Sequence, residues 1–154
     1  MSSERAPLNQ LMVEGTSETR SRLRMRVRDL EQVIDEPEAR GGTNLGVAPT
    51  EAVLGGLLGC INVVARRFAE KKGFEVTRLE VEATAHFDPR GSRLVAPVEV
   101  PFPLIEMTVV IKTSASPTDA AALRDDIPAY CPIWQLFARS GTRFDVDWQI
   151  KPGD

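Results

Sequence analysis

The residues with the most chemistry to offer in this chain are two cysteines, Cys60 and Cys131, and one histidine, His86. Two cysteines and one histidine cannot make a C-x-x-C, C₂H₂ or H-E-x-x-H metal site within one chain, so no metal is expected. A Ser-His-Asp or Cys-His catalyst would depend on His86 alone. In a reducing compartment, two cysteines either fill the core or perform redox chemistry, and composition does not choose between these interpretations.

Cys60 lies within a segment whose pattern is helical from Pro49 to about Lys72. Pro49 suits the first helical position because its missing N–H would be unpaired there, and Gly73 ends the pattern. Residues 52–65 carry no charge. A helix that is apolar on every side must be central and wrapped by other elements.

Three glycines lie beside Cys60 on this helix: Gly55, Gly56 and Gly59. Each costs about 1 kcal/mol against alanine inside a helix. Either another backbone or a ligand approaches the helix closely there, or the glycines allow tight helix–helix packing. Both explanations account for them equally well.

Cys131 precedes Pro132, which is well placed to open a short helix around residues 133–139. The cysteine would then cap that helix, with its sulfur at the positive end of the helix dipole. Because such a position lowers the pKa of a thiol, we expect a lowered pKa for Cys131. Cys60 lies deep in its own helix, gains nothing from a dipole and needs a nearby guanidinium to become a thiolate.

The rest of the chain alternates strands and helices. Apolar residues alternate with polar ones in four segments expected to form strands, which are residues 20–28, 79–87, 105–111 and 144–148. Residues 31–35, centred on Val33-Ile34 and stopped at Pro37, are expected to form a further short strand. A second helix covers residues 119–126, and Pro128 and Pro132 are expected to break it. This order predicts an α+β fold in which antiparallel sheet packs on a long buried helix. We expect one domain over residues 16–154, after an arm of residues 1–15 without clear period.

Composition excludes several classes of function. The 154 residues carry a formal net charge of −3, which gives no general reason to expect nucleic acid as a partner. No uninterrupted apolar run approaches the ~20 residues that span a bilayer, so no membrane partner is expected. The first residues lack the basic and apolar regions of a signal peptide. A cytoplasmic protein is the simplest interpretation.

Two separated motifs resemble those of a known family. The first joins D-E-P at 35–37 and G-G at 41–42 to the run G-V-A-P-T-E-A-V-L-G-G-L-L-G-C that ends at Cys60. The second is Y-C-P-I at 130–133. Over about residues 20–150 the chain resembles the OsmC/Ohr family, named for osmotically inducible protein C and organic hydroperoxide resistance protein. The resemblance implies an α+β fold whose long cysteine-bearing helix is central to an intertwined homodimer, with active sites at the subunit interface.

The resemblance also implies a function, because characterised members of the family are thiol peroxidases that reduce organic hydroperoxides in oxidative-stress defence. Carried over, Cys60 would attack the peroxide and Cys131 would close a disulfide. A dithiol such as a lipoyl group would then restore the pair, and no bound cofactor is implied. The alternative is a non-catalytic small-molecule-binding or stress-response protein.

The family's peroxidases also carry an arginine near the N-terminus and a glutamate directly after the helix-opening proline. Arg20 and Arg22 are the candidates for the arginine, although a solvated strand face is the other interpretation of this basic strand. Glu51 is the candidate for the glutamate, but Thr50 separates it from the proline. Nine residues place Glu51 ~13 Å from Cys60 along a regular helix and half a turn out of phase. Helix capping is its alternative role.

Three further residues have a plain structural alternative. Phe102, Pro103 and Trp134 could line an apolar mouth for an alkyl hydroperoxide, and Trp134 could equally belong to the core. His86 is expected on the polar side of a strand, at the surface.

Overall fold

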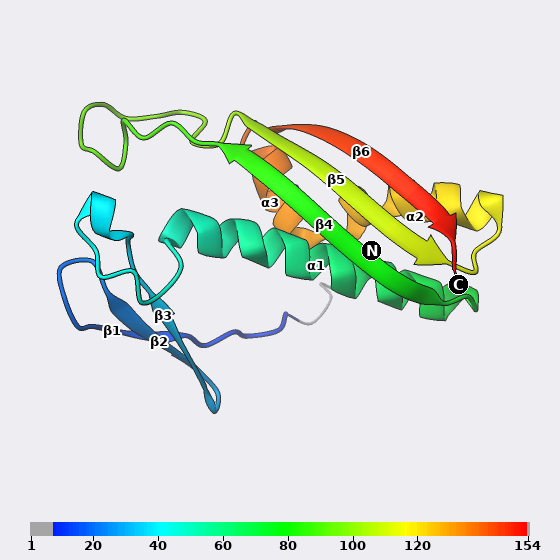
Figure 1. The fold of residues 1–154 in the computed structure, drawn as a ribbon, viewed down its shortest axis with the longest axis horizontal. Helices are drawn as coiled ribbons and strands as arrows, with labels where there is room; N and C mark the ends of the chain where they lie inside the picture. The colour runs from blue at the N-terminus through cyan, green and yellow to red at the C-terminus, as the bar shows by residue number, and fades with distance from the viewer. Residues whose placement is uncertain (1–7, 154) are drawn as a thin grey trace, which may run out of the picture. The chain divides into compact units, whose positions relative to one another are not determined.

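The structure, a computed structural model, describes residues 8–153 of the chain. The chain is divided into two compact units, the first ending at Val53 and the second beginning at Leu54. Figure 1 shows the elements of both. The boundary falls inside the long helix α1. In chain order the elements are β1 (Glu14–Ser17), β2 (Leu23–Val27), β3 (Leu30–Ile34), the 3₁₀ helix η1 (Glu38–Arg40), α1 (Pro49–Lys72), β4 (Val76–His86), β5 (Leu104–Thr113), α2 (Pro117–Tyr130), α3 (Pro132–Arg139) and β6 (Arg143–Pro152).

The first unit contains a three-stranded antiparallel sheet in the order β1–β2–β3. Its middle strand is the one in which arginines alternate with apolar residues, as the period of two predicts, although it is shorter than 20–28. It ends before Arg28, whose φ of 56° belongs to the turn into β3. The segment without clear period contributes β1, which pairs with β2 at the edge of the sheet. Residues 1–7 of the expected arm lie outside the described residues.

Helix α1 has the bounds that the sequence predicts, Pro49–Lys72. Its buried side chains are small or apolar and follow one another at four-residue steps: Leu57, Ile61, Ala65 and Ala69. With ~3.6 residues per turn, this spacing puts them on one face of the helix. The opposite face exposes Gly55, Gly59 and Val63. Within this chain, therefore, α1 is covered on one side.

By length and composition alone, α1 could also cross a membrane, and it is the one such helix in residues 8–153. Its uncharged run is shorter than the ~20 residues of a typical span, and core helices of globular proteins meet the same criterion. In this chain 22% of the apolar window of α1 is buried, so the expected wrapping on every side is not present within a single chain.

The second unit contains a sheet in the order β4–β5–β6. Strands β4 and β5 are antiparallel, with Leu79 opposite Ile111 and Ala85 opposite Ile105. Apolar side chains of β5 alternate into the core as expected, and all are at most 4% exposed: Ile105, Met107, Val109 and Ile111.

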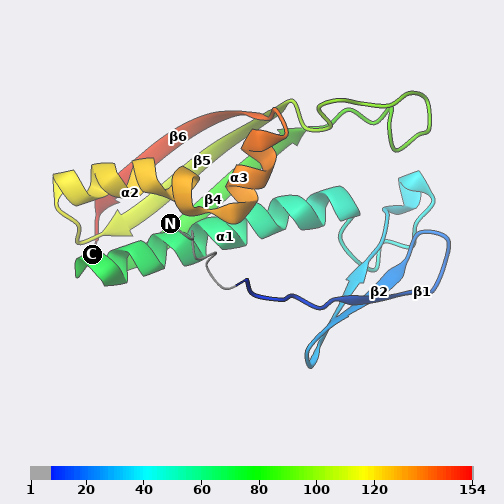
Figure 2. The same ribbon diagram turned by 180° about the vertical axis from the view of Figure 1, so that it is seen from behind.

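The pairing of β6 differs from the expected antiparallel sheet, because β6 runs parallel to β5. Parallel neighbours need a long crossover connection, which α2 and α3 together provide. Both helices lie on one face of the sheet, and Figure 2 shows them from that side.

Helix α2 begins directly after Ser116, whose side chain caps it by accepting a hydrogen bond from the Asp119 amide. The expected break at Pro128 is wrong, because the helix continues through it to Tyr130. A proline at this position removes one helical hydrogen bond, that of its own missing N–H, and Ile127 beside it is fully buried. The break comes instead at Cys131, whose extended backbone is the conformation favoured before Pro132.

Candidate active site

The two cysteines meet inside the second unit. Cys60 comes from the middle of α1 and is half-buried, whereas Cys131 lies between α2 and α3 and is fully buried. The side chain of Cys60 lies close enough to that of Cys131 to affect its pKa. Both sulfurs are free thiols. The fold therefore brings together the two groups that the sequence motifs single out.

Cys131 caps α3 as predicted, and the amide of Trp134 donates a hydrogen bond to its sulfur at 3.3 Å. The expected lowering of its pKa is nevertheless wrong. Burial raises the pKa of the Cys131 thiol to about 12, and the hydrogen bond with Cys60 adds to the rise. The amides of Trp134 and Ile133 act in the opposite direction but are outweighed. The free energy needed to remove a thiolate from water is larger than the stabilisation that the helix N-terminus gives to it.

Aromatic packing fixes α3, and with it Cys131, on the sheet. Trp134 stacks on Phe144 of β6, with ring centroids 4.2 Å apart and ring planes 15° apart. Phe137 meets Phe102 edge-on at 5.4 Å. Trp134 is 6% exposed, so it belongs to the core, which was the alternative to its lining an apolar mouth.

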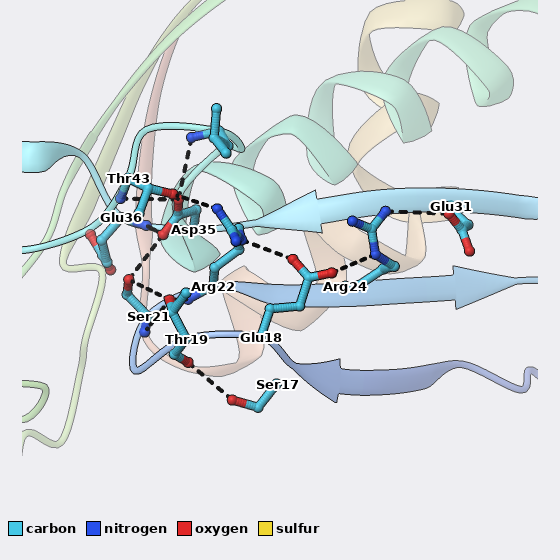
Figure 3. A network of polar contacts seen from close by, with 11 residues as sticks. Ser17, Glu18, Thr19, Ser21, Arg22, Arg24, Glu31, Asp35, Glu36 and Thr43 are labelled. Carbon is cyan, nitrogen blue, oxygen red and sulfur yellow. Dashed lines mark hydrogen bonds and ion pairs between the residues drawn. The ribbon is translucent and has the colours of Figure 1, made fainter.

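In the first unit, the fully buried carboxylate of Asp35 is the centre of a hydrogen-bond network (Figure 3). It accepts hydrogen bonds from the Thr43 hydroxyl, the Ser21 hydroxyl, and the amides of Glu36, Thr43 and Leu45. The hydrogen bond from the Thr43 hydroxyl contributes most, and together these donors hold the pKa of Asp35 well below its usual range despite burial.

This network ties together three parts of the first unit: the turn before β2, the end of β3, and the loop that leads to α1. Sequence reasoning quoted Asp35 only as a motif letter and missed this function. The available signal was a carboxylate placed directly after the apolar pair Val33-Ile34, with hydroxyl-bearing residues eight to fourteen positions away.

The two candidate arginines also lie in the first unit, on the turn that Asp35 holds. Arg22 donates to Glu18 at 2.8 Å and to the Thr43 hydroxyl at 3.0 Å, so its guanidinium is fixed (Figure 3). Arg20 is exposed and donates to the carbonyl of Gly41 at 3.4 Å.

The neighbouring arginines of β2 form ion pairs along the surface of the sheet. Arg24 bridges Glu18 and Glu31, and Arg26 pairs with Glu31. These contacts agree with a solvated, ion-paired strand face for Arg24 and Arg26. Arg22 differs from them because its second partner, Thr43, also binds the buried Asp35.

Glu51 contacts the start of its own helix. Its carboxylate accepts a hydrogen bond from the Ala48 amide at 2.8 Å. Ala48 directly precedes the first helical residue, so this is the reciprocal contact of a capping box. The capping role expected as the alternative is present, and the proposed catalytic role stays a prediction.

His86 is exposed on the outer side of β4, as expected, and its Nε2 lies 2.5 Å from Glu106. In residues 8–153 no group of three or more His, Cys, Asp or Glu side chains is arranged to hold a metal ion.

The geometry and both motifs agree with the family comparison. The OsmC-like protein family matches residues 42–147, and the chain belongs to this family. The α+β architecture, with two three-stranded sheets and three α-helices in the described residues, is the OsmC-like fold. No curated protein matches the chain by sequence.

Solved structures with the same fold are distant in sequence. An OsmC-like protein from Mycoplasma pneumoniae has a TM-score of 0.75 and 18% identity, over 93% of this chain and 98% of that one. An organic hydroperoxide resistance protein OsmC from Legionella pneumophila has a TM-score of 0.65 and 14% identity, over 95% and 99%. An organic hydroperoxide resistance protein from Elizabethkingia anophelis has a TM-score of 0.63 and 16% identity, over 95% and 98%.

Proposed function

We propose that this chain is a cysteine-based thiol peroxidase that reduces organic hydroperoxides and serves in oxidative-stress defence. The observation that carries the proposal is the contact between Cys60 and Cys131. Two neighbouring thiols are the arrangement from which a disulfide can form once one of them is oxidised. Family membership and neighbours described as organic hydroperoxide resistance proteins add support.

The burial of the two sulfurs divides the roles between them. With a pKa raised to about 12, Cys131 keeps its proton at neutral pH and is a poor first nucleophile. Cys60 is the more accessible sulfur and receives a hydrogen bond rather than a helix cap. We therefore assign the attack to Cys60 and the second step to Cys131.

The reaction then balances in three steps. The Cys60 thiolate attacks the distal peroxide oxygen of ROOH, the O–O bond breaks, and Cys60 becomes a sulfenic acid while the alkoxide takes a proton and leaves as ROH. Cys131 displaces the hydroxyl from the sulfenic acid, which releases water and forms the disulfide. An external dithiol of the lipoyl type reduces this disulfide by exchange and is itself oxidised to a cyclic disulfide.

We also propose that a second copy of the chain completes the site, so that the active protein is a homodimer. Gly55, Gly59 and Val63 expose a flat strip on α1, and a Cβ built on either glycine meets no atom within 4 Å in this chain. Glycine lowers helix stability, and no other part of the chain that the structure describes packs against these two glycines. They therefore leave room for the backbone of another chain. Sedimentation of the reduced protein should give a dimer, and a monomer at micromolar concentration would refute this part.

In this homodimer, the positive charge of Arg20 or Arg22 would stabilise the Cys60 thiolate. Arg22 is the better candidate, because its guanidinium is fixed by Glu18 and Thr43 whereas Arg20 makes one long contact. We place the reaction in the cytoplasm, where a reducing environment keeps both thiols free between turnovers.

One set of observations favours the second candidate, a non-catalytic small-molecule-binding or stress-response protein. Arg22 is already paired with Glu18, and Glu51 already caps α1. Groups engaged in this way are less available to activate a thiol. This alternative predicts that Cys60 reacts with a small alkylating reagent no faster than an exposed cysteine in an unfolded peptide.

One experiment separates the two functions. Reduced protein is mixed with cumene hydroperoxide in a stopped-flow instrument, and free thiols are counted as the reaction proceeds. A peroxidase loses both thiols for each equivalent of peroxide and recovers them with a dithiol. Retention of both thiols under excess peroxide would exclude the proposal.

A further inference from the structure

A groove in the second unit lies between the C-terminal half of α1 and the end of α2. The residues that line it are Val64, Arg67, Phe68, Lys71 and Lys72 of α1 on one side and Asp126 and Tyr130 of α2 on the other. Its volume is about 520 Å³, which is within the range of small-molecule sites. The proposed peroxide chemistry does not use these residues.

The charge of the groove is unbalanced. Arg67, Lys71 and Lys72 face a single carboxylate, that of Asp126. In the described part of the chain, none of the three cations forms an ion pair with a carboxylate, and Lys72 lies 5.8 Å above the ring of Phe68. The helix dipole accounts for lysines in the last turn of α1. It does not account for Arg67, which lies before that turn.

The other end of the groove is apolar. Val64 and Phe68 are one turn apart on α1, and Tyr130, which is 71% exposed, also lines the groove. Val64 comes one turn after Cys60 and Tyr130 directly precedes Cys131, so the apolar end adjoins the cysteine pair. From Val64 to Lys71 the helix rises ~10 Å, about the length of a medium alkyl chain.

We propose that this groove binds an amphipathic carboxylate. Its apolar chain lies along Val64 and Phe68, and its carboxylate pairs with Arg67 and Lys71. A guanidinium and an ammonium one turn apart can hold two carboxylate oxygens, and the hydrophobic contact supplies the rest of the affinity. The proposal does not depend on peroxide reduction, because a ligand without a peroxide group would bind equally well.

Isothermal titration calorimetry on the full reduced chain tests the proposal with three probes. Decanoate has both an alkyl chain and a carboxylate, acetate lacks the chain, and 1-decanol lacks the charge. We expect decanoate to bind at least roughly tenfold more tightly than either of the others. Equal affinity for decanoate and 1-decanol would overturn the carboxylate contact, and absence of decanoate binding would overturn the site.

Paired variants assign the binding to the groove. The double variant Arg67→Gln/Lys71→Gln should weaken decanoate roughly tenfold and leave 1-decanol unchanged. The charge-preserving double variant Arg67→Lys/Lys71→Arg should bind decanoate nearly as the wild type does. Arg93→Gln/Arg139→Gln, which removes two exposed cations outside the groove, is the matched control.

Three results would contradict the assignment. One is decanoate binding that survives Arg67→Gln/Lys71→Gln, and another is equal weakening by the control variant. The third is a glutamine variant whose sedimentation changes while decanoate binding is absent, because the groove would then be a contact between copies of the chain. Peroxide is absent from all these measurements, so a failed peroxidase assay leaves their outcome unaffected.

Discussion

The side chain of Cys131 lies beside that of Cys60, and it is the buried member of the pair that has the raised pKa. This relationship places a protonated sulfur beside the sulfur that would be oxidised. Burial shields this thiol from oxidants in the solvent. In the proposed mechanism the same thiol lies beside the sulfur that would become the sulfenic acid, so the second step would need little movement.

Substitution of each cysteine should stop the reaction at a different step. In Cys60→Ser, peroxide turnover should fall by roughly a thousandfold or more, as expected on loss of a nucleophile, and Cys131 should remain a thiol. In Cys131→Ser, Cys60 should still react but stop at the sulfenic acid, seen by mass spectrometry as the gain of one oxygen. Oxidation of Cys131 in the Cys60→Ser variant would reverse the assigned roles.

The raised pKa of Cys131 should make the protein less stable in alkali. The unfolded chain releases this proton near pH ~8.5, whereas the native state holds it until about 12. Between these values the unfolded state binds fewer protons, so the free energy of unfolding falls as pH rises, by at most ~1.4 kcal/mol per pH unit.

Urea unfolding of the reduced protein at about pH 8 and about pH 10 measures this effect. The variant Cys131→Ala removes the titrating thiol and should show a smaller fall. Equal falls in the wild type and the variant would show that the thiol is not protected from ionisation.

Glu51 should contribute to stability through its cap. Glu51→Ala removes the hydrogen bond to the Ala48 amide and should cost about 1 kcal/mol of unfolding free energy. Glu51→Gln keeps an acceptor oxygen and should cost less. We expect the initial rate of Cys60 oxidation in both variants to stay within about twofold of the wild type. A large rate loss in Glu51→Gln, with stability preserved, would establish a catalytic role.

Asp35→Asn should loosen the first unit, because an amide replaces an acceptor that receives five hydrogen bonds. The melting temperature should fall by about 5–10 °C. The wild-type contribution is present above the unfolded pKa of ~3.9 and is lost as pH falls through the lowered pKa of the folded state, so the variant should lose less stability in acid. Asp29→Asn, at an exposed aspartate of the β2–β3 turn, should change neither property.

Local patterns predict much of this fold because they depend on near neighbours in the chain. The alternation of apolar and polar residues predicted β2, β4, β5 and β6. Pro49 and Gly73 predicted the two ends of α1. The parallel pairing of β6 could not be predicted, since it depends on where the α2–α3 crossover returns the chain. The continuation of α2 through Pro128 depends on the burial of Ile127, which is a tertiary effect.

In the candidate site, too, the local features could be predicted from the sequence and the tertiary ones could not. Motifs identified Cys60 and Cys131, and the prolyl residue after Cys131 correctly predicted its capping position. The direction of its pKa was wrong because the helix terminus is a local feature, whereas burial depends on the whole unit. The Asp35 network was missed for the same reason, since its donors come from segments on both sides of β3.

Trp134 should be the residue whose loss most affects the presentation of Cys131. Its ring stacks on Phe144 and its amide donates to the Cys131 sulfur. Trp134→Ala should cost about 3–5 kcal/mol of unfolding free energy and slow disulfide formation after Cys60 is oxidised, because α3 loses its anchor on the sheet. Trp134→Phe should retain most of both properties.

Leu136→Ala is the matched control for this prediction, because Leu136 lies on the same helix but is 61% exposed. It should change stability by less than about 0.5 kcal/mol. Urea unfolding measures the first effect, and rapid quenching with an alkylating reagent after one equivalent of peroxide measures the second. If Trp134→Ala lost stability but closed the disulfide at the wild-type rate, the contact of Cys131 with Cys60 would not require the packing of α3.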